Sequence, residues 1–350
     1  MIMKRLARRL LIFFIFLLCI LVISSCSSAE KKTALKVLIV PKFEIDDMNG
    51  DFPGEAQLFY KEYCDGCEKI EIPHMPPTGE FYVNEENGVG LLITGSGKTA
   101  AGLSLSALLS SDLYDFSEAY IVSVGCGGGS ETYCSLGDVI VETAVCDYDL
   151  GHHVDAHEKK KSNNRIMWFP DDSFADYECK FYNADLCEKV YQMVKDCPLR
   201  TTEMAKSVIK DNFKARYESD ILPAVRKGTA LTGDNFWKGI YGHVTASYIT
   251  KYYACPDPYA VTEMEDIAIA NTASCYDMFD RLIALRVIVN MDVFLKGETP
   301  ESIWGEYDGY NNKVKEENSE TLDIFEPAMH NLFDAGSIVI DSILEGTIGE

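Results

Sequence analysis

Apolar, β-prone runs separated by helix-like stretches predict an α/β protein whose central sheet is covered by helices on both faces. Strands are expected over residues 35–40, 89–94, 119–124, 138–143 and 285–290. Helices are expected over residues 100–109, 185–195, 201–213 and 268–278. The strand runs are continuously apolar instead of alternating, which is typical of strands buried on both faces.

Composition narrows the class of protein further. The chain has 350 residues, of which 47% are hydrophobic, and a formal net charge of −23 at pH 7. The apolar fraction is sufficient for a sizeable core. An acidic surface repels a phosphate backbone, so a general DNA or RNA binder is excluded and no nucleic-acid partner is expected. The single long apolar run excludes a channel built from several membrane-crossing helices.

The N-terminal segment has the pattern of an export signal. A basic start precedes an apolar run over residues 10–23, and small residues follow. The ending Ile23-Ser24-Ser25-Cys26 resembles the bacterial lipobox, in which the chain is cut before a cysteine that carries lipid. An uncleaved signal anchor is the alternative, and both predict an extracytoplasmic, membrane-anchored bacterial protein. The expected organisation is a signal peptide over 1–25, lipidation at Cys26, a tether over 26–34 and one domain over 35–350.

The cysteines leave several structures open. Of the 12 cysteines, all but Cys19 and Cys26 lie in the expected domain, where an oxidising compartment permits disulfides. Cys64-Asp65-Gly66-Cys67 has the spacing of a redox pair, a short bridge or half a zinc site. No second C-x-x-C or H-x-x-x-H accompanies it, so no metal site is predicted, and a short bridge or buried free thiols are expected.

Two glycine-rich segments follow expected strands. Thr94-Gly95-Ser96-Gly97-Lys98-Thr99 leads into an Ala-rich helix, but the nucleotide P-loop pattern needs a glycine where Leu92 stands. Backbone N–H groups at that helix start can bind phosphate or another polar ligand, although a tight turn also explains the glycines. Gly125-Cys126-Gly127-Gly128-Gly129 allows the backbone to approach a ligand or another strand closely.

Two further segments carry side chains suited to a sugar and a planar base. Glu263-Met264-Glu265-Asp266 places three carboxylates before an Ala-rich helix. A carboxylate can accept two hydrogen bonds from a vicinal diol, although acidic residues are also favoured at any helix start. Phe236 and Trp237 follow Gly233-Asp234-Asn235 and could stack on a base, although most aromatic side chains belong to cores.

In their order along the chain, these motifs resemble the purine nucleoside permease family. The opening motif comprises Lys42-Phe43-Glu44 and Gly50-Asp51-Phe52-Pro53-Gly54-Glu55. The likeness continues through residues 94–97, 149–156, 231–239, 264–266 and 285–290. That family is similar in turn to the nucleoside phosphorylase and nucleosidase superfamily. The resemblance implies a nucleoside phosphorylase-like fold, with a mixed, twisted and partly closed central sheet flanked by helices.

The resemblance also implies roles for individual residues. Met264 and Glu265 would hold ribose, and Phe236 would stack on the base. The loop that carries Gly95 and Gly97 would border the ribose or a phosphate. No cofactor is expected, with inorganic phosphate as a candidate co-substrate.

The expected catalytic position departs from the nucleosidase pattern. Asn290, four residues after Arg286, stands where the nucleosidase branch has an acidic residue, and Val289 replaces its usual serine. An acid can protonate a leaving purine, whereas an amide can only donate a hydrogen bond. Asp292 returns to the same face of an extended strand and could substitute as the catalytic acid.

Three functions remain open from the sequence. The protein could cleave the N-glycosidic bond of purine nucleosides with phosphate or water. It could bind nucleosides without chemistry and serve a separate membrane transporter, because a chain without spanning helices cannot itself be the pore. It could also be an enzyme fold that has only a structural role at the surface.

Cys26→Ser should leave the precursor without lipid and shift the protein out of the membrane fraction or stall its processing. The lipobox-like ending directly after the apolar run is the reason. Fractionation and immunoblotting test this. A variant that fractionates with membranes as the wild type does would indicate a signal anchor instead.

Overall fold

The computed structural model describes residues 32–45, 47–50, 52–154, 168–170, 177–299 and 319–349. The expected signal peptide, the Cys26 lipidation site and most of the tether lie outside these residues. Ala34–Glu350 forms one compact unit. Within the described ranges, no helix combines the length and the apolar character needed to cross a bilayer.

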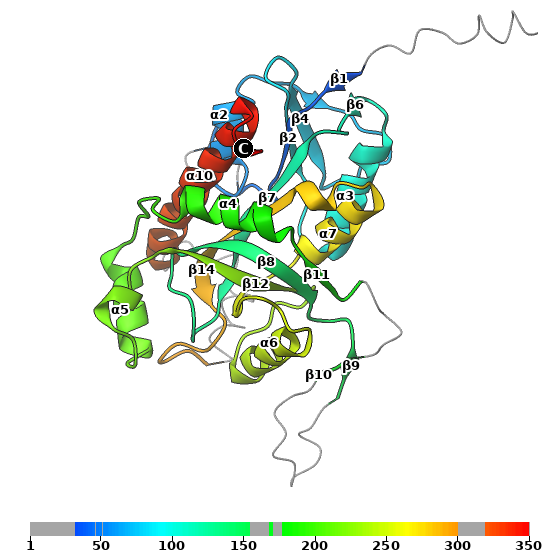
Figure 1. The fold of residues 1–350 in the computed structure, drawn as a ribbon. Helices are drawn as coiled ribbons and strands as arrows, with labels where there is room; N and C mark the ends of the chain where they lie inside the picture. The colour runs from blue at the N-terminus through cyan, green and yellow to red at the C-terminus, as the bar shows by residue number, and fades with distance from the viewer. Residues whose placement is uncertain are drawn as a thin grey trace, which may run out of the picture. The chain divides into compact units, whose positions relative to one another are not determined.

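A ten-stranded mixed sheet runs through this unit (Figure 1). Its strands lie in the order β11-β8-β12-β13-β7-β2-β5-β4-β3, and β14 pairs with both β7 and β8. Because β14 joins these two strands, β7, β13, β12, β8 and β14 form a closed ring, and the remaining strands extend from it as an open sheet. The mixed, partly closed sheet predicted from the sequence is confirmed. The strands are β2 (Val37–Val40), β3 (Lys69–Ile70), β4 (Glu80–Asn84), β5 (Val89–Ile93), β7 (Tyr120–Gly129), β8 (Val139–Asp147), β11 (Cys179–Phe181), β12 (Val225–Thr232), β13 (Tyr259–Glu263) and β14 (Leu282–Met291).

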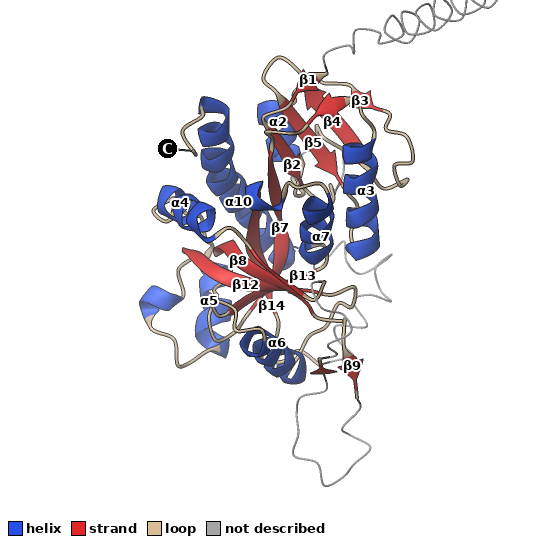
Figure 2. Ribbon diagram, turned by 45° about the vertical axis from the view of Figure 1, so that its right-hand side comes forward, coloured by secondary structure: helices blue, strands red, loops and turns tan. Residues whose placement is uncertain are grey.

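Helices cover both faces of the sheet, as Figure 2 shows. Alternate residues of β2 belong to different cores: Val37 and Ile39 pack in the core of α2, α4 and α10, whereas Leu38 packs in that of α3 and α7. This alternation explains why the strand is apolar at every position. The helices are α2 (Gln57–Tyr63), α3 (Lys98–Ser110), α4 (Ala184–Val194), α5 (Glu203–Asn212), α6 (Ile240–Tyr252), α7 (Asp266–Cys275) and α10 (Ser319–Glu345).

Short elements complete the described fold. Side-chain caps fix two of the helix starts: Asn183 accepts a hydrogen bond from the Leu186 N–H and Thr202 accepts one from the Ala205 N–H. The two-residue strands are β1 (Thr33–Ala34), β6 (Tyr114–Asp115), β9 (His152–His153) and β10 (Trp168–Phe169), and the 3₁₀ turns are η3 (Glu218–Asp220) and η4 (Phe279–Arg281).

The glycine-rich segment after residue 124 continues strand β7 to Gly129, whereas the sequence predicted that the strand would end before it. A Cβ atom at Gly127 would lie 2.5 Å from Val261 Cγ2 and 2.6 Å from the Thr262 carbonyl oxygen. One at Gly125 would lie 2.6 Å from Arg286 Nη1. The glycines therefore permit β13 and the Arg286 side chain to approach β7 closely.

The carboxyl ends of three parallel strands lie at the same level. Asp147 of β8 is in register with Thr232 of β12, which is in register with Glu263 of β13. The loops that follow these strands therefore meet at one edge of the sheet, where open α/β folds bind ligands.

Strand β14 contains a bulge near its end. Ile288 is opposite Gly127 and Asn290 is opposite Gly128, so Val289 is an extra residue on this strand. A bulge changes the direction of the side chains that follow it. The bulge precedes Asn290, and regular pairing resumes after it, with Asn290 opposite Gly128 and Met291 opposite Gly129.

Gly127→Ala should lower the free energy of unfolding by about 1–3 kcal/mol, because the added methyl group would overlap backbone and a β-branched side chain. Urea denaturation measures this. Gly102→Ala is the matched control. It lies inside α3, where its Cβ would meet nothing closer than 3.6 Å, and it should stabilise by about 0.5–1 kcal/mol. Equal stabilities of Gly127→Ala and wild type would contradict the close approach.

Candidate functional site

A cavity of about 270 Å³ opens where the loops after the sheet strands meet. Five of the residues predicted to form a site line it: Phe236, Met264, Glu265, Asn290 and Asp292. They come from three segments that are separated by tens of residues in the sequence, and Asn290 lies at the end of β14. Its other lining residues are Lys42, Phe43, Glu55, Ser96, Cys126, Gly127, Gly128, Asn235, Trp237, Lys238, Thr262, Glu263, Arg286, Val289 and Met291.

The two predicted glycines of the first loop are not among the lining residues, whereas Ser96 between them is. Gly95 N–H donates to the Lys42 carbonyl oxygen, and Gly97 N–H donates to Glu265 Oε1 at 2.8 Å. Both glycines have positive φ angles, 82° and 91°, which explains their residue type. The loop therefore supports the predicted ribose ligand Glu265.

Arg286 lies at the base of the cavity and is buried among carboxylates. Its Nε donates to Asp266 at 2.7 Å, and its Nη2 donates to Glu263 at 2.7 Å and to Glu265 at 3.3 Å. Nη1 donates to the Cys126 carbonyl oxygen. The guanidinium thus fixes all three acidic side chains of the Glu263–Asp266 segment in one arrangement.

Lys42 is the second buried cation of this group. Its Nζ donates to Ser123 Oγ at 2.6 Å and to two backbone carbonyl oxygens, and it lies 3.5 Å from Asp266 Oδ1. Burial opposes ionisation of Asp266, but Arg286 and Lys42 outweigh it and hold the pKa of that carboxyl well below its usual range. Asp266 is therefore ionised and is a counter-ion of Lys42 and Arg286 beneath the cavity.

Glu265 has hydrogen-bonding capacity left for a ligand. Its Oε1 accepts from Gly97 N–H and its Oε2 from Arg286, which leaves lone pairs on both oxygens. Burial raises its pKa, against the opposing charges of Arg286 and Lys42. In contrast, Glu263 accepts hydrogen bonds from the Glu265 and Asp266 N–H groups, from Arg286 and from Thr232. The saturated Glu263 supports the segment, and Glu265 is free to bind.

Glu55 is a second half-satisfied carboxylate, to which the sequence assigned no role. It is 3% exposed and lines the cavity. Its Oε1 accepts from Cys126 N–H at 2.7 Å and its Oε2 from Lys42 N–H at 2.9 Å. Glu55 and Arg286 both lie beside Gly125. A Cβ atom at that position would be within 3.1 Å of both side chains, so the two side chains are close to each other. The opening motif, which contains Glu55, is the sequence feature that could have identified this residue as part of the site.

The aromatic wall consists of Phe236 and Trp237. Phe236 is 64% exposed, so one side of its ring is available to a base at the cavity mouth. Trp237 stacks on Tyr148 with ring centroids 5.0 Å apart. Its Nε1–H is buried and has no partner among the described residues.

Asn290 and Asp292 both line the cavity but differ in what holds them. For Asn290, no side-chain hydrogen bond is found within the described part of the chain. Asp292 Oδ2 accepts from His243 Nδ1 at 2.8 Å and from the Tyr259 hydroxyl at 2.9 Å. Burial would lower the pKa of His243, but Asp292 outweighs it and the pKa is raised. No motif in the sequence pointed to His243, which comes from α6.

The cations around the cavity are already neutralised. Lys238 pairs with Glu298 at 2.7 Å, and Lys42 and Arg286 are paired as described. At the start of α3, Lys98 N–H donates to Asp234 and Lys98 Nζ contacts Asp147 and Asp149. Throughout the described residues, each Lys or Arg that lines the cavity has an acidic partner. Four carboxylates also line it, so its electrostatic environment disfavours an anion.

The family model of purine nucleoside permease (NUP) matches residues 34–347. The chain belongs to the purine nucleoside permease family.

Curated relatives of this family member are similar along most of its length. A probable purine nucleoside permease of Schizosaccharomyces pombe is 26% identical over 304 residues, which are 81% of this chain and 82% of the relative. A purine nucleoside permease of Candida albicans is 23% identical over 303 residues, 80% of this chain and 70% of the relative.

Solved structures show that this family member has a nucleoside phosphorylase-like fold. The 5'-methylthioadenosine/S-adenosylhomocysteine nucleosidase of Neisseria meningitidis aligns with a TM-score of 0.52 at 16% identity, over 87% of this chain and 98% of that one. The futalosine hydrolase of Helicobacter pylori aligns with a TM-score of 0.53 at 12% identity, over 90% and 100%. The fold predicted from the sequence is confirmed.

Glu142 belongs to a cluster of buried carboxyl groups beneath the cavity that outnumbers its buried cations. Among the described residues, five buried carboxyl groups of this cluster, those of Glu55, Glu142, Glu263, Glu265 and Asp266, are accompanied by two buried cations, Lys42 and Arg286. Burial, followed by the charges of Asp266 and Glu263, raises the pKa of Glu142 well above its usual value. Glu142 therefore keeps its proton to higher pH than a free glutamate does.

The contribution of Glu142 to protein stability should fall as pH rises above about 4.5, because the unfolded chain then releases a proton that the raised pKa lets the folded chain retain. Glu142→Gln mimics the neutral acid and should remove up to about 1.4 kcal/mol per pH unit of this slope. Urea denaturation between about pH 5 and 8 measures it. The exposed Glu62→Gln on α2 is the control, and an unchanged slope in Glu142→Gln would contradict the assignment.

Proposed function

We propose that this chain is an extracytoplasmic, lipid-anchored nucleosidase that binds purine nucleosides and cleaves their N-glycosidic bond with water. The observation that carries the proposal is the half-satisfied Glu265 carboxylate, fixed by Arg286 at the base of the cavity. Its free lone pairs can accept hydrogen bonds from both hydroxyls of a ribose diol. Phe236 and Trp237 then provide an aromatic surface for the base.

Glu55 is the proposed base for the attacking water. Its carboxylate is held by two backbone N–H groups and keeps lone pairs for a water proton. The water oxygen bonds to C1′ as the bond from C1′ to the base nitrogen breaks, and the water proton passes to Glu55. The products are free ribose and the base. A positively charged sugar in the transition state would be favoured by the carboxylates that line the cavity.

Water is favoured over phosphate as the nucleophile. The sequence left phosphate open as a co-substrate, and the loop of Gly95 and Gly97 was its expected neighbour. In the described structure, the N–H groups of Gly97 and Lys98 are already bonded to Glu265 and Asp234. A phosphate dianion at this helix start would displace carboxylates and face their repulsion.

The leaving base also needs a proton. Asn290 can donate a hydrogen bond but no proton at ordinary pH. The pair of Asp292 and His243 is the proposed source, because Asp292 lines the cavity and a protonated His243 donates to it. The raised pKa of His243 keeps its imidazole protonated to higher pH than a free histidine.

The second candidate function is nucleoside binding without cleavage, in support of a separate membrane transporter. The observation that favours it is the amide of Asn290 at a position where an acid would assist cleavage. A lipid at Cys26 would hold the protein at the membrane in both functions.

Incubation of the detergent-solubilised chain with adenosine and inosine, with and without inorganic phosphate, tests the proposal. We expect free base and free ribose at the same rate in both conditions. Formation of ribose 1-phosphate would contradict hydrolysis. Tight nucleoside binding without base release would favour the transport function, and neither binding nor release would contradict both.

Glu265→Gln should weaken nucleoside affinity by at least about 10-fold, because one charge-assisted hydrogen bond to ribose is lost. Glutamine keeps an oxygen for Gly97 N–H, so the loop is preserved. Calorimetry measures the affinity. Glu203→Gln, exposed on α5, is the control, and unchanged affinity in Glu265→Gln would remove this residue from the site.

Asn290→Asp should raise adenosine cleavage at mildly acidic pH, where a half-buried carboxyl group with a raised pKa is partly protonated. Asp292→Asn should lower the cleavage rate and remove the loss of activity that accompanies deprotonation of His243. Base release is measured from about pH 5 to 8. Full activity of Asp292→Asn, with no gain in Asn290→Asp, would show that neither residue supplies the proton.

A further inference from the structure

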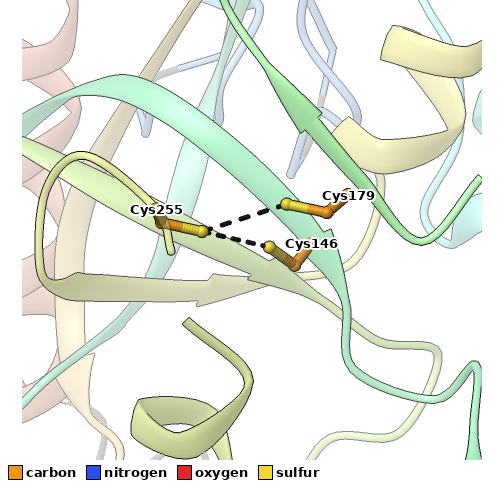
Figure 3. A group of neighbouring side chains, drawn as sticks. All are labelled: Cys146, Cys179 and Cys255. Atoms are coloured by element: carbon orange, nitrogen blue, oxygen red, sulfur yellow. Dashed lines mark hydrogen bonds between the residues drawn. The ribbon is translucent and has the colours of Figure 1, made fainter. Parts of the chain in front are cut away.

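Three cysteines from separate segments meet beside the closed ring of strands, as Figure 3 shows. Cys255 Sγ lies 3.5 Å from Cys146 Sγ and 3.9 Å from Cys179 Sγ, and all three sulfur atoms lie within 4.8 Å of one another. All three thiols are free. We propose that Cys146, Cys179 and Cys255 bind one thiophilic metal ion, Zn(II) or Cu(I), through their three thiolates.

The spacing of the sulfur atoms fits an ion at their centre. Thiolates bound at about 2.3 Å to one ion lie roughly 3.7–4.0 Å from one another in tetrahedral or trigonal geometry. A disulfide instead requires its sulfur atoms at about 2.05 Å. Three donors are also an odd number for disulfides, because one bridge leaves a thiol unpaired. Soft thiolate ligands select Zn(II) and Cu(I) over hard cations.

Regular secondary structure fixes the positions of the three ligands. Cys146 of β8 and Cys179 of β11 are directly opposite each other in an antiparallel pair. Cys255 follows α6, where Cys255 N–H donates to the Thr250 carbonyl oxygen and Ala254 N–H donates to that of Lys251. These two bonds form a Schellman motif, with Ala254 at φ 52°. The site is therefore organised before an ion binds.

The surroundings of the three thiols also favour a cation. The carboxylate of Glu178, next to Cys179, is 6% exposed. Its Oε2 accepts from the Tyr253 hydroxyl, and its Oε1 is buried with no partner among the described residues. Cys146 is fully buried, whereas Cys179 and Cys255 are half-buried and leave a path for entry. An ion here would balance the thiolates and the adjacent carboxylate.

No metal site was predicted from the sequence, because the C-x-x-C pair of Cys64 and Cys67 has no second ligand pair of metal-binding spacing. The three cysteines proposed here are tens of residues apart and have no ligand spacing that a sequence could show. Binding requires the thiols to lose their protons, so up to three protons are released as the ion enters.

The test uses the full chain, solubilised in detergent and kept reduced. Zn(II) and, separately, Cu(I) are titrated against a chromophoric chelator, and X-ray absorption of the loaded protein gives the ligands. We expect one ion per chain with three sulfur ligands at about 2.3 Å in at least one arm. The arm that gives this result identifies the ion.

Cys146→Ser, Cys179→Ser and Cys255→Ser should each lower the affinity by at least about 100-fold, because even outer partners of metal ligands contribute 10–100-fold. Cys275→Ser, an exposed thiol at the end of α7, and Cys67→Ser are matched controls that should bind as wild type. Metal binding should also raise the melting temperature of wild type but not of Cys255→Ser.

Three results would overturn the proposal. The first is an X-ray absorption spectrum of the metal-loaded wild type that shows no sulfur ligands. This result overturns the proposal even if a variant fails to fold. The second is affinity that none of the three substitutions changes. The third is a disulfide of Cys255 with Cys146 or Cys179 in the protein as isolated under non-reducing conditions, combined with no metal binding after reduction.

Discussion

The buried Arg286 guanidinium is the interaction on which the site depends. It donates hydrogen bonds to Asp266, Glu263 and Glu265 at once and thereby fixes the end of β13 and the start of α7. Removing a buried cation of this kind leaves several uncompensated carboxylates and is strongly destabilising. The close approach of its side chain also requires a residue without a Cβ at position 125. Arg286 therefore links the glycine-rich end of β7 to the acidic Glu263–Asp266 segment.

The same arrangement of charges determines what the cavity can bind. Arg286 and Lys42 are already paired with buried carboxylates, and the carboxylates of Glu55 and Glu265 keep unused lone pairs in the cavity. Such a site suits hydroxyl groups and a developing positive charge and disfavours anions. The raised pKa of Glu142 favours its neutral form and so reduces the excess negative charge within the cluster. The same buried carboxylates that pair with Arg286 and Lys42 also disfavour a phosphate anion in the cavity, and so support water as the proposed nucleophile.

The sequence predicted the fold well where a strand or helix was uniform in character. Apolar runs identified β2, β5 and β14, and Ala-rich or amphipathic stretches identified α3 and α4. It did not predict β12 or β13, which polar and glycine residues interrupt. The motif resemblance led to Glu265 and Phe236, which the structure places in one cavity. The motif that contains Glu55 pointed to this region but not to the role of Glu55. The sequence could not reveal His243, whose role depends on its contact with Asp292, or the bulge at Val289, which depends on pairing with β7.

A crystal structure of the protein with a nucleoside analogue that resists cleavage tests the central claim most directly. The account predicts both ribose hydroxyls within about 3.2 Å of the Glu265 carboxylate oxygens and the base against Phe236 and Trp237. It also predicts a water bonded to Glu55 beside the anomeric carbon. An analogue bound with its ribose away from Glu265, or a phosphate held beside Arg286 in place of that water, would contradict the account.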